Sequence, residues 1–143
     1  MESSPARAAE RAFKSALTLD PQLAEARLRL GRVAYLLGRL HDAEEQWQLT
    51  IRDAAARGDR FSHYLALLFL GQLREEQHRT GDAAVCYQKA IEIQPYAQTA
   101  RVALTRLLLE SGQSAKAWSV LEQTVSATFE DSFDPWYTYT PIQ

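Results

Sequence analysis

The chain has 143 residues, of which 46% are hydrophobic and 24% charged, a composition typical of a globular protein rather than a disordered one. Its 16 basic and 18 acidic side chains give a formal net charge of -2, which argues against nucleic-acid binding and against a polybasic membrane patch. The longest apolar run, residues 64–70, is far shorter than the roughly 20 residues of a membrane span, so we expect no membrane insertion.

The N-terminus and the cysteine content bear on the compartment. The first five residues lack the basic start and apolar stretch of a secretory signal. The single cysteine, Cys86, excludes an internal disulfide. We therefore expect a cytoplasmic protein, while noting that a fragment of an exported protein would show the same features.

Apolar residues recur at helical spacing along the chain, and no segment shows the sustained alternation of a strand. Helix-start signals set the phase: Ser4 and Pro5 suit a first turn, and Asp42 with Glu45 resembles a capping box. Glycines are expected in the turns, including Gly81. The expected helices, in chain order, are 5–19, 23–37, 42–57, 61–79, 82–94, 97–111 and 114–127.

One spacing recurs along these helices: an alanine, a large residue four positions later, and an alanine or threonine three positions after that. The repeat alanines are Ala9, Ala43, Ala83 and Ala117, which lie 34, 40 and 34 residues apart. The large residues are Phe13, Trp47, Tyr87 and Leu121. Gly31, Gly71 and Thr105 each lie 12 positions before a repeat alanine. Small residues at these positions predict pairs of closely packed helices, with the large residues filling the space between pairs.

Over residues 5–127 this pattern resembles the tetratricopeptide repeat (TPR) family. The resemblance implies an all-α fold, a right-handed superhelical array of antiparallel helix pairs (a TPR-like α-solenoid) with about three and a half repeats. We expect a single domain, 1–143. Its parts are a half repeat 5–21, repeats 23–58, 61–95 and 96–127, and a non-repeat aromatic tail 128–143.

The sequence also departs from the family pattern. Arg27, Leu67 and Arg101 replace the large aromatic residue expected three positions before the leucine of each first helix. The second repeat lacks its closing proline and has about six extra residues near 54–60. The array begins with the second helix of a repeat, so we expect either a fragment of a longer protein or another chain covering that flank.

In this family the first helix of each repeat lines a concave face that binds peptides or partner domains. The resemblance therefore implies a protein-protein interaction scaffold, with Arg32 and Arg106 placed to meet carboxylates or backbone carbonyls. An alternative is that the same residues form a solvated helix face and pack neighbouring repeats. The predicted contact residues are Leu28, Arg32, Tyr35, Leu68, Gln72, Glu75, Val102, Arg106 and Leu109.

Chaperone-binding members of the family hold a C-terminal carboxylate with a clamp of lysine and asparagine side chains. The matching positions here are Leu28, Arg32, Phe69, Thr99 and Ala103. Only Arg32 suits such a clamp, so this function is not expected.

No catalytic motif, phosphate-binding loop or metal-ligand spacing is present in the sequence. His41, His63 and His78 are scattered, and Cys86 lies within a packing helix, where an inert thiol is expected. We therefore expect no enzyme activity, no cofactor and no metal. The alternative to a scaffold is a structural segment that self-associates through its terminal helix and aromatic tail.

The tail contains Pro135 and Pro141, which exclude one continuous helix. Its Trp136, Tyr137 and Tyr139 are too apolar for a typical disordered segment, so we expect them to dock. The specific expectation is that Trp136 covers the end of the array around Leu121 and Thr124. Alternatives are docking in a groove of the same or a neighbouring chain, the start of a further structural element, or disorder.

Overall fold

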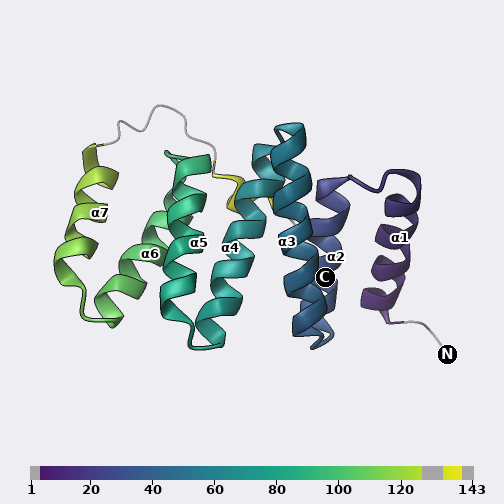
Figure 1. Cartoon of the computed structure of the whole chain (residues 1–143), viewed down its shortest axis with the longest axis horizontal. Coiled ribbons are helices and arrows are strands. Elements are labelled where there is room, and N and C mark those ends of the chain that lie inside the picture. Colours follow the sequence, from purple (N-terminus) through teal and green to yellow (C-terminus); the bar gives the residue numbers. More distant parts are fainter. Residues whose placement is uncertain (1–3, 127–133, 140–143) are drawn as a thin grey trace. The chain divides into compact units, whose positions relative to one another are not determined.

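The computed structural model describes residues 4–126 and 134–139, and the elements in these ranges are all helical (Figure 1). The all-α prediction is therefore confirmed. The helices are α1 (Pro5–Leu19), α2 (Ala24–Leu36), α3 (Leu40–Arg57), α4 (Arg60–Glu76), α5 (Thr80–Ile93), α6 (Gln98–Glu110), α7 (Ser114–Ser126) and the short 3-10 helix η1 (Pro135–Thr138). Within these ranges, none of the helices combines the length and hydrophobicity needed to cross a bilayer.

The chain divides into two compact units, with the boundary inside α4 between Ala66 and Leu67. The first unit contains α1, α2, α3 and the start of α4, and the second runs from Leu67 to Tyr139.

In the first unit, α2 and α3 form a tightly packed hairpin around Gly31. The Trp47 side chain of α3 is 1% exposed, and its indole Nε1 donates to the Leu28 carbonyl of α2 over 3.3 Å. A Cβ added at Gly31 would lie 2.5 Å from Trp47 Nε1, far inside van der Waals contact. The small residue predicted at this position is needed because a larger one would overlap the Trp47 side chain.

The second unit repeats this arrangement at Gly71. The Tyr87 ring of α5 is 1% exposed, and a Cβ added at Gly71 would approach Tyr87 Cε1 to 2.5 Å. The next hairpin, α6 and α7, is packed around the fully buried Ala117. The hairpins at Gly31 and Gly71 thus each pair a glycine with the large residue that the repeat spacing indicates, Trp47 or Tyr87.

Two helices begin earlier than the capping signals predicted. The first residues of α3 and α5 are Leu40 and Thr80, so Asp42 and Asp82 lie inside the first turn rather than at the cap. At the start of each of these two helices the carboxylate forms an ion pair with the preceding cap residue, which is Arg39 in α3 and Arg79 in α5. An acidic residue in the first turn complements the positive end of the helix dipole, which explains its presence without a capping role.

The turn after α4 also differs from the expectation. Gly81 lies within α5, and the left-handed residue of this turn is His78, with φ 57°. The His78 N–H donates to the Glu75 carbonyl, and the next N–H donates to the Arg74 carbonyl five residues back. Gly38 and Gly112 close α2 and α6 with the same bonds at φ near 75°. A histidine therefore occupies a position that normally favours glycine.

Candidate protein-interaction surfaces

The predicted contact residues lie on α2, α4 and α6, but two of them are inaccessible. Leu28 is 0% exposed and Leu68 is 1% exposed, so both belong to the packed core. The expectation that they line a contact surface needs correction, because their neighbours in the repeat fill the space around them. Val102 and Leu109 of α6 are 63% and 48% exposed and present apolar surface.

Arg106 of α6 is held in an ion-pair network of the second unit. Its Nη2 donates to both Glu75 carboxylate oxygens over 2.7 and 2.8 Å, and its Nη1 lies 3.0 Å from Glu110 Oε2. The Tyr87 hydroxyl donates to the same Glu75 carboxylate. Burial and this carboxylate raise the pKa of Tyr87, and hydrogen bonding to Glu75 raises the pKa of Arg106. Arg106 therefore links α4 to α6 in addition to presenting charge.

Arg32 of the first unit lies over an aromatic ring of its own helix. Its guanidinium carbon is 5.2 Å from the centroid of the Tyr35 ring, a cation-π distance, and the Tyr35 ring lies 6.0 Å from that of Trp47. Gln72 of α4 is half-buried.

Two aromatic residues of the tail pack against Phe69 within the second unit. The Trp136 ring lies 5.8 Å from the Phe69 ring, and the Tyr139 ring lies 5.2 Å from it in an edge-on arrangement. Phe69 belongs to α4, and η1 lies beside α4 in Figure 1. The expectation that Trp136 covers the end around Leu121 and Thr124 is therefore wrong. Tyr137 lies among the residues whose side chains are outside the described part of the structure.

An aspartate anchors the start of this tail segment to α6. Asp134 Oδ2 accepts hydrogen bonds from the Thr99 N–H over 2.9 Å and from the Thr99 hydroxyl over 2.7 Å. Helix α6 begins after Ala97, which offers no side-chain acceptor, so the carboxylate from 35 residues away supplies the missing cap. The other oxygen, Oδ1, accepts the Trp136 N–H and starts η1. Phe69 and Thr99 contact the tail segment, and Gln72 and Val102 each lie three residues further along the same helix. We call these four residues the α4/α6 face.

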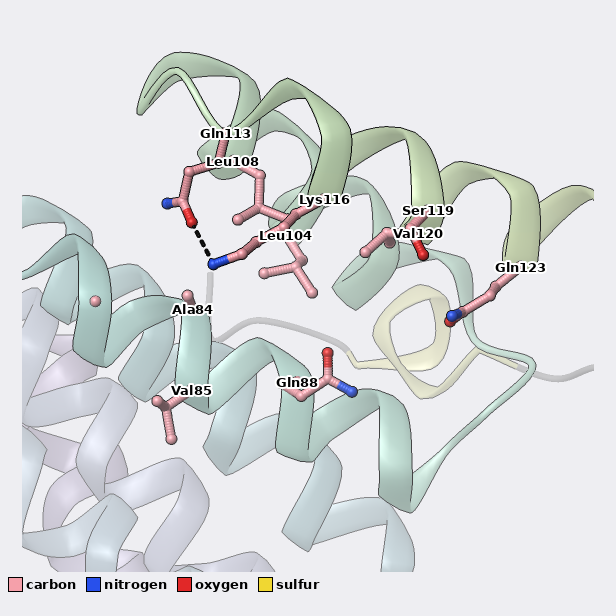
Figure 2. Close-up of a pocket in the computed structure, with 11 residues that line it drawn as sticks. Ala84, Val85, Gln88, Leu104, Leu108, Gln113, Lys116, Ser119, Val120 and Gln123 are labelled. Carbon is pink, nitrogen blue, oxygen red and sulfur yellow. Dashed lines mark hydrogen bonds between the residues drawn. The ribbon is translucent and has the colours of Figure 1, made fainter.

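A second surface of the same unit is a groove of about 510 Å³ between α5 and α7 (Figure 2). Leu104 and Leu108 of α6 form part of its wall, and Lys116 Nζ donates to Gln113 Oε1 over 2.8 Å at one end. The remaining lining residues are Gly81, Ala84, Val85, Gln88, Ser119, Val120 and Gln123. The mixture of amide and aliphatic side chains contains no convergent charges or catalytic pair.

Arg27 and Arg101, which stand where a large aromatic residue was expected, share one role that the sequence analysis did not identify. Arg101 Nη2 donates to the Pro95 carbonyl over 2.7 Å, and Arg27 Nη2 donates to the Pro21 carbonyl over 2.6 Å. Each arginine thus binds the closing proline six residues earlier. Leu67 takes the equivalent position in the repeat that follows the missing proline. This correlation between the two departures was available in the sequence as a signal.

Arg27 has an additional partner in the first unit. Its Nε donates over 2.8 Å to Asp53 of α3, a residue that is 3% exposed and that also pairs with Arg52 over 2.7 Å. Arg27 therefore connects the loop after α1 to both helices of the next hairpin. The buried carboxylate is compensated by two arginines, as a buried charge requires.

Two of the sequence candidates for chemistry, Cys86 and His63, are buried or partly buried. Burial raises the pKa of the Cys86 thiol, which disfavours the reactive thiolate, and burial lowers the pKa of His63. Among residues 4–126 and 134–139, no group of three or more His, Cys, Asp or Glu side chains is placed to hold a metal ion.

These hairpins place the protein in the class of all-α solenoids. Within that class, two solved structures of MamA, a TPR-like protein, are similar to it. One is 24% identical with a TM-score of 0.65 and covers 83% of this chain, which spans 66% of that chain. The other is 18% identical with a TM-score of 0.40, over 87% of this chain and 86% of that chain. No family model and no curated protein matches the sequence.

Proposed function

We propose that this protein is an interaction scaffold whose second unit binds a peptide segment of a partner on the α4/α6 face. The observation that carries the proposal is the chain's own segment 134–139, which is seated on this face. Asp134 is 6% exposed, Pro135 is less than 2% exposed and Tyr139 is 9% exposed. A face against which Asp134, Pro135 and Tyr139 are buried in this way has the chemistry of a peptide site.

The α4/α6 face offers three kinds of contact. Thr99 provides two donors for a carboxylate at a helix N-terminus, where the dipole also favours negative charge. Phe69 provides an aromatic surface, and the exposed Val102 extends the apolar area along α6. Arg106 and Glu75 lie one turn further along these helices and add charge of both signs.

A library experiment tests this proposal. Random peptides are selected against the full chain carrying Trp136→Ala, which weakens the hold of the tail, and the affinity of each selected peptide is measured by fluorescence anisotropy. We expect Val102→Glu to weaken the selected peptides at least about tenfold, as loss of about 1.4 kcal/mol implies. The matched control is Ser119→Glu, an exposed position in the α5/α7 groove.

The opposite pattern refutes the proposal. If the selected peptides tolerate Val102→Glu and lose affinity with Ser119→Glu, the binding surface is the α5/α7 groove. If selection yields no peptide that either substitution weakens, the second unit has no peptide site on either surface.

A structural role in a larger assembly is the second candidate function, and the exposed surfaces of α1 and α7 favour it. No residue of α1 is buried, and Leu19 is 89% exposed. Trp118 of α7 is 62% exposed and Val125 is 81% exposed. Light scattering tests this role: self-association predicts a molecular mass that rises with concentration and falls back in Trp118→Glu. A constant monomer mass for the unaltered chain would contradict it.

A further inference from the structure

The tail segment is held by its side chains as a ligand would be. The carboxylate of Asp134 receives two hydrogen bonds from one residue, Thr99, and both aromatic rings contact one residue, Phe69. These two anchor points lie on different helices, α6 and α4. The segment therefore bridges two first helices of successive hairpins.

The spacing within the segment follows from the geometry of a 3-10 turn. Such a turn has about three residues per turn, so side chains three positions apart point the same way. Trp136 lies in η1 and Tyr139, three positions later, is its C-terminal cap residue, which is consistent with both rings contacting Phe69. Pro135 suits the first position because it has no N–H to satisfy and its φ is already fixed.

The carboxylate is required twice in this arrangement. Asp134 Oδ2 caps α6 by accepting from the Thr99 N–H, and Asp134 Oδ1 caps η1 of the tail by accepting from the Trp136 N–H over 3.0 Å. An amide in place of the carboxylate would offer only one accepting oxygen and no charge for the helix end. The site therefore selects an acidic residue immediately before the turn.

We infer that the α4/α6 face recognises partner segments of the pattern acidic–Pro–aromatic–x–x–aromatic, and that residues 134–139 are an internal competitor for such partners. This inference rests on the proposed function of the face. A segment that belongs to the same chain as its site acts at an effective concentration on the order of 1 mM. For a tail segment with an intrinsic Kd of about 100 µM, the ratio of tail-bound to empty sites is then about ten to one. A partner that competes with the tail therefore binds about tenfold more weakly.

The test uses a synthetic peptide with the sequence of residues 130–141, blocked at both ends and labelled with fluorescein. Its affinity is measured for the full chain and for the full chain with Trp136→Ala. We expect at least about tenfold tighter binding to the variant, because its own tail competes less well. Asp134→Ala serves as a second variant that leaves both rings in place, and circular dichroism checks that each variant keeps its helices.

The recognition pattern is tested with altered peptides. A peptide carrying Asp134→Asn should bind Trp136→Ala protein at least about tenfold more weakly, and Thr99→Val in the protein should have a similar effect on the unaltered peptide. A peptide carrying Ser132→Ala is the matched control and should keep its affinity, because the proposed pattern begins at Asp134.

Several results would overturn this inference. Equal affinity of the peptide for the unaltered and Trp136→Ala chains would exclude internal competition while leaving the peptide site intact. Library peptides that depend on Val102 but lack the acidic and aromatic pattern would exclude the proposed specificity alone. A dimer of the unaltered chain that Trp136→Ala converts to monomer would show that the tail binds a second copy instead. Failure of the library selection itself would remove the proposed function as well.

Discussion

Gly71→Ala tests the close approach between α4 and α5. The added Cβ would lie 2.5 Å from Tyr87 Cε1 and 2.9 Å from Cδ1 and Cζ, whereas carbon atoms normally stay about 3.5–4.0 Å apart. The ring must therefore move by about 1 Å. It is 1% exposed and its hydroxyl is bonded to Glu75, so little space is available for that movement.

Two effects of the substitution oppose each other. Alanine in a helix interior is more favourable than glycine by about 1 kcal/mol. Overpacking costs about 1–3 kcal/mol, and weakening a hydrogen bond to a charged group costs about 1.5–3 kcal/mol. We expect a net loss of about 2 kcal/mol. With an unfolding entropy of about 2.1 cal/mol/K per residue over 143 residues, this corresponds to a Tm about 6–7 °C lower.

Thermal unfolding followed by circular dichroism measures this effect, with Gly81→Ala as the matched control. Gly81 also lies in a helix, but a Cβ there meets nothing within 4 Å, so its Tm should stay level or rise. In a Tyr87→Phe background, where the ring has lost its bond to Glu75, Gly71→Ala should cost less. Equal stability of Gly71→Ala and Gly81→Ala would refute the reasoning.

Three further substitutions test local features. His78→Gly should stabilise the chain by about 1 kcal/mol in urea unfolding, because it relieves a left-handed backbone at φ 57°, and a loss would contradict the turn geometry. Asp53→Ala should destabilise by about 2–4 kcal/mol by leaving Arg27 without its buried partner, whereas Asp42→Ala, in an exposed pair, should change stability by less than about 1 kcal/mol. Burial lowers the pKa of His63 in the folded chain, so as pH falls the His63 imidazole is protonated first in the unfolded chain. Stability should therefore fall as pH drops from about 6.5 toward the folded pKa. His63→Gln should remove this part of the pH dependence of stability.

The hairpins could be predicted from the sequence because their cause is local and repeated. Gly31 and Gly71 precede Trp47 and Tyr87 by the same 16 positions, and each pair is a close contact in the structure. Helix starts were less predictable, because an aspartate suits both the cap and the first turn. The same ambiguity placed Gly81 in the turn, whereas it lies inside α5 and the left-handed residue of the turn is His78.

The position of the tail required information that periodicity does not carry. The contact between Asp134 and Thr99 joins residues 35 positions apart, and only the tertiary structure brings them together. The sequence does contain two partial signals, an α6 start without a side-chain cap and an aspartate before proline. Sequence reasoning likewise treated Arg106 only as a contact for a partner. It missed the ion pair with Glu75, because that pair depends on the distance between α4 and α6 in the folded chain.

The bonds from Arg27 and Arg101 to the preceding proline carbonyls bear on how the chain folds. Each bond closes a loop of only six residues, for which the entropy of closure is small. Such local contacts can form before any distant pairing, and repeat arrays can begin to fold wherever a hairpin first becomes stable. One of these loops lies in each unit, at Pro21 and at Pro95. Within the described residues, each unit therefore contains one such loop at which helix pairing can start, whereas the leucine side chain of Leu67 cannot form this bond.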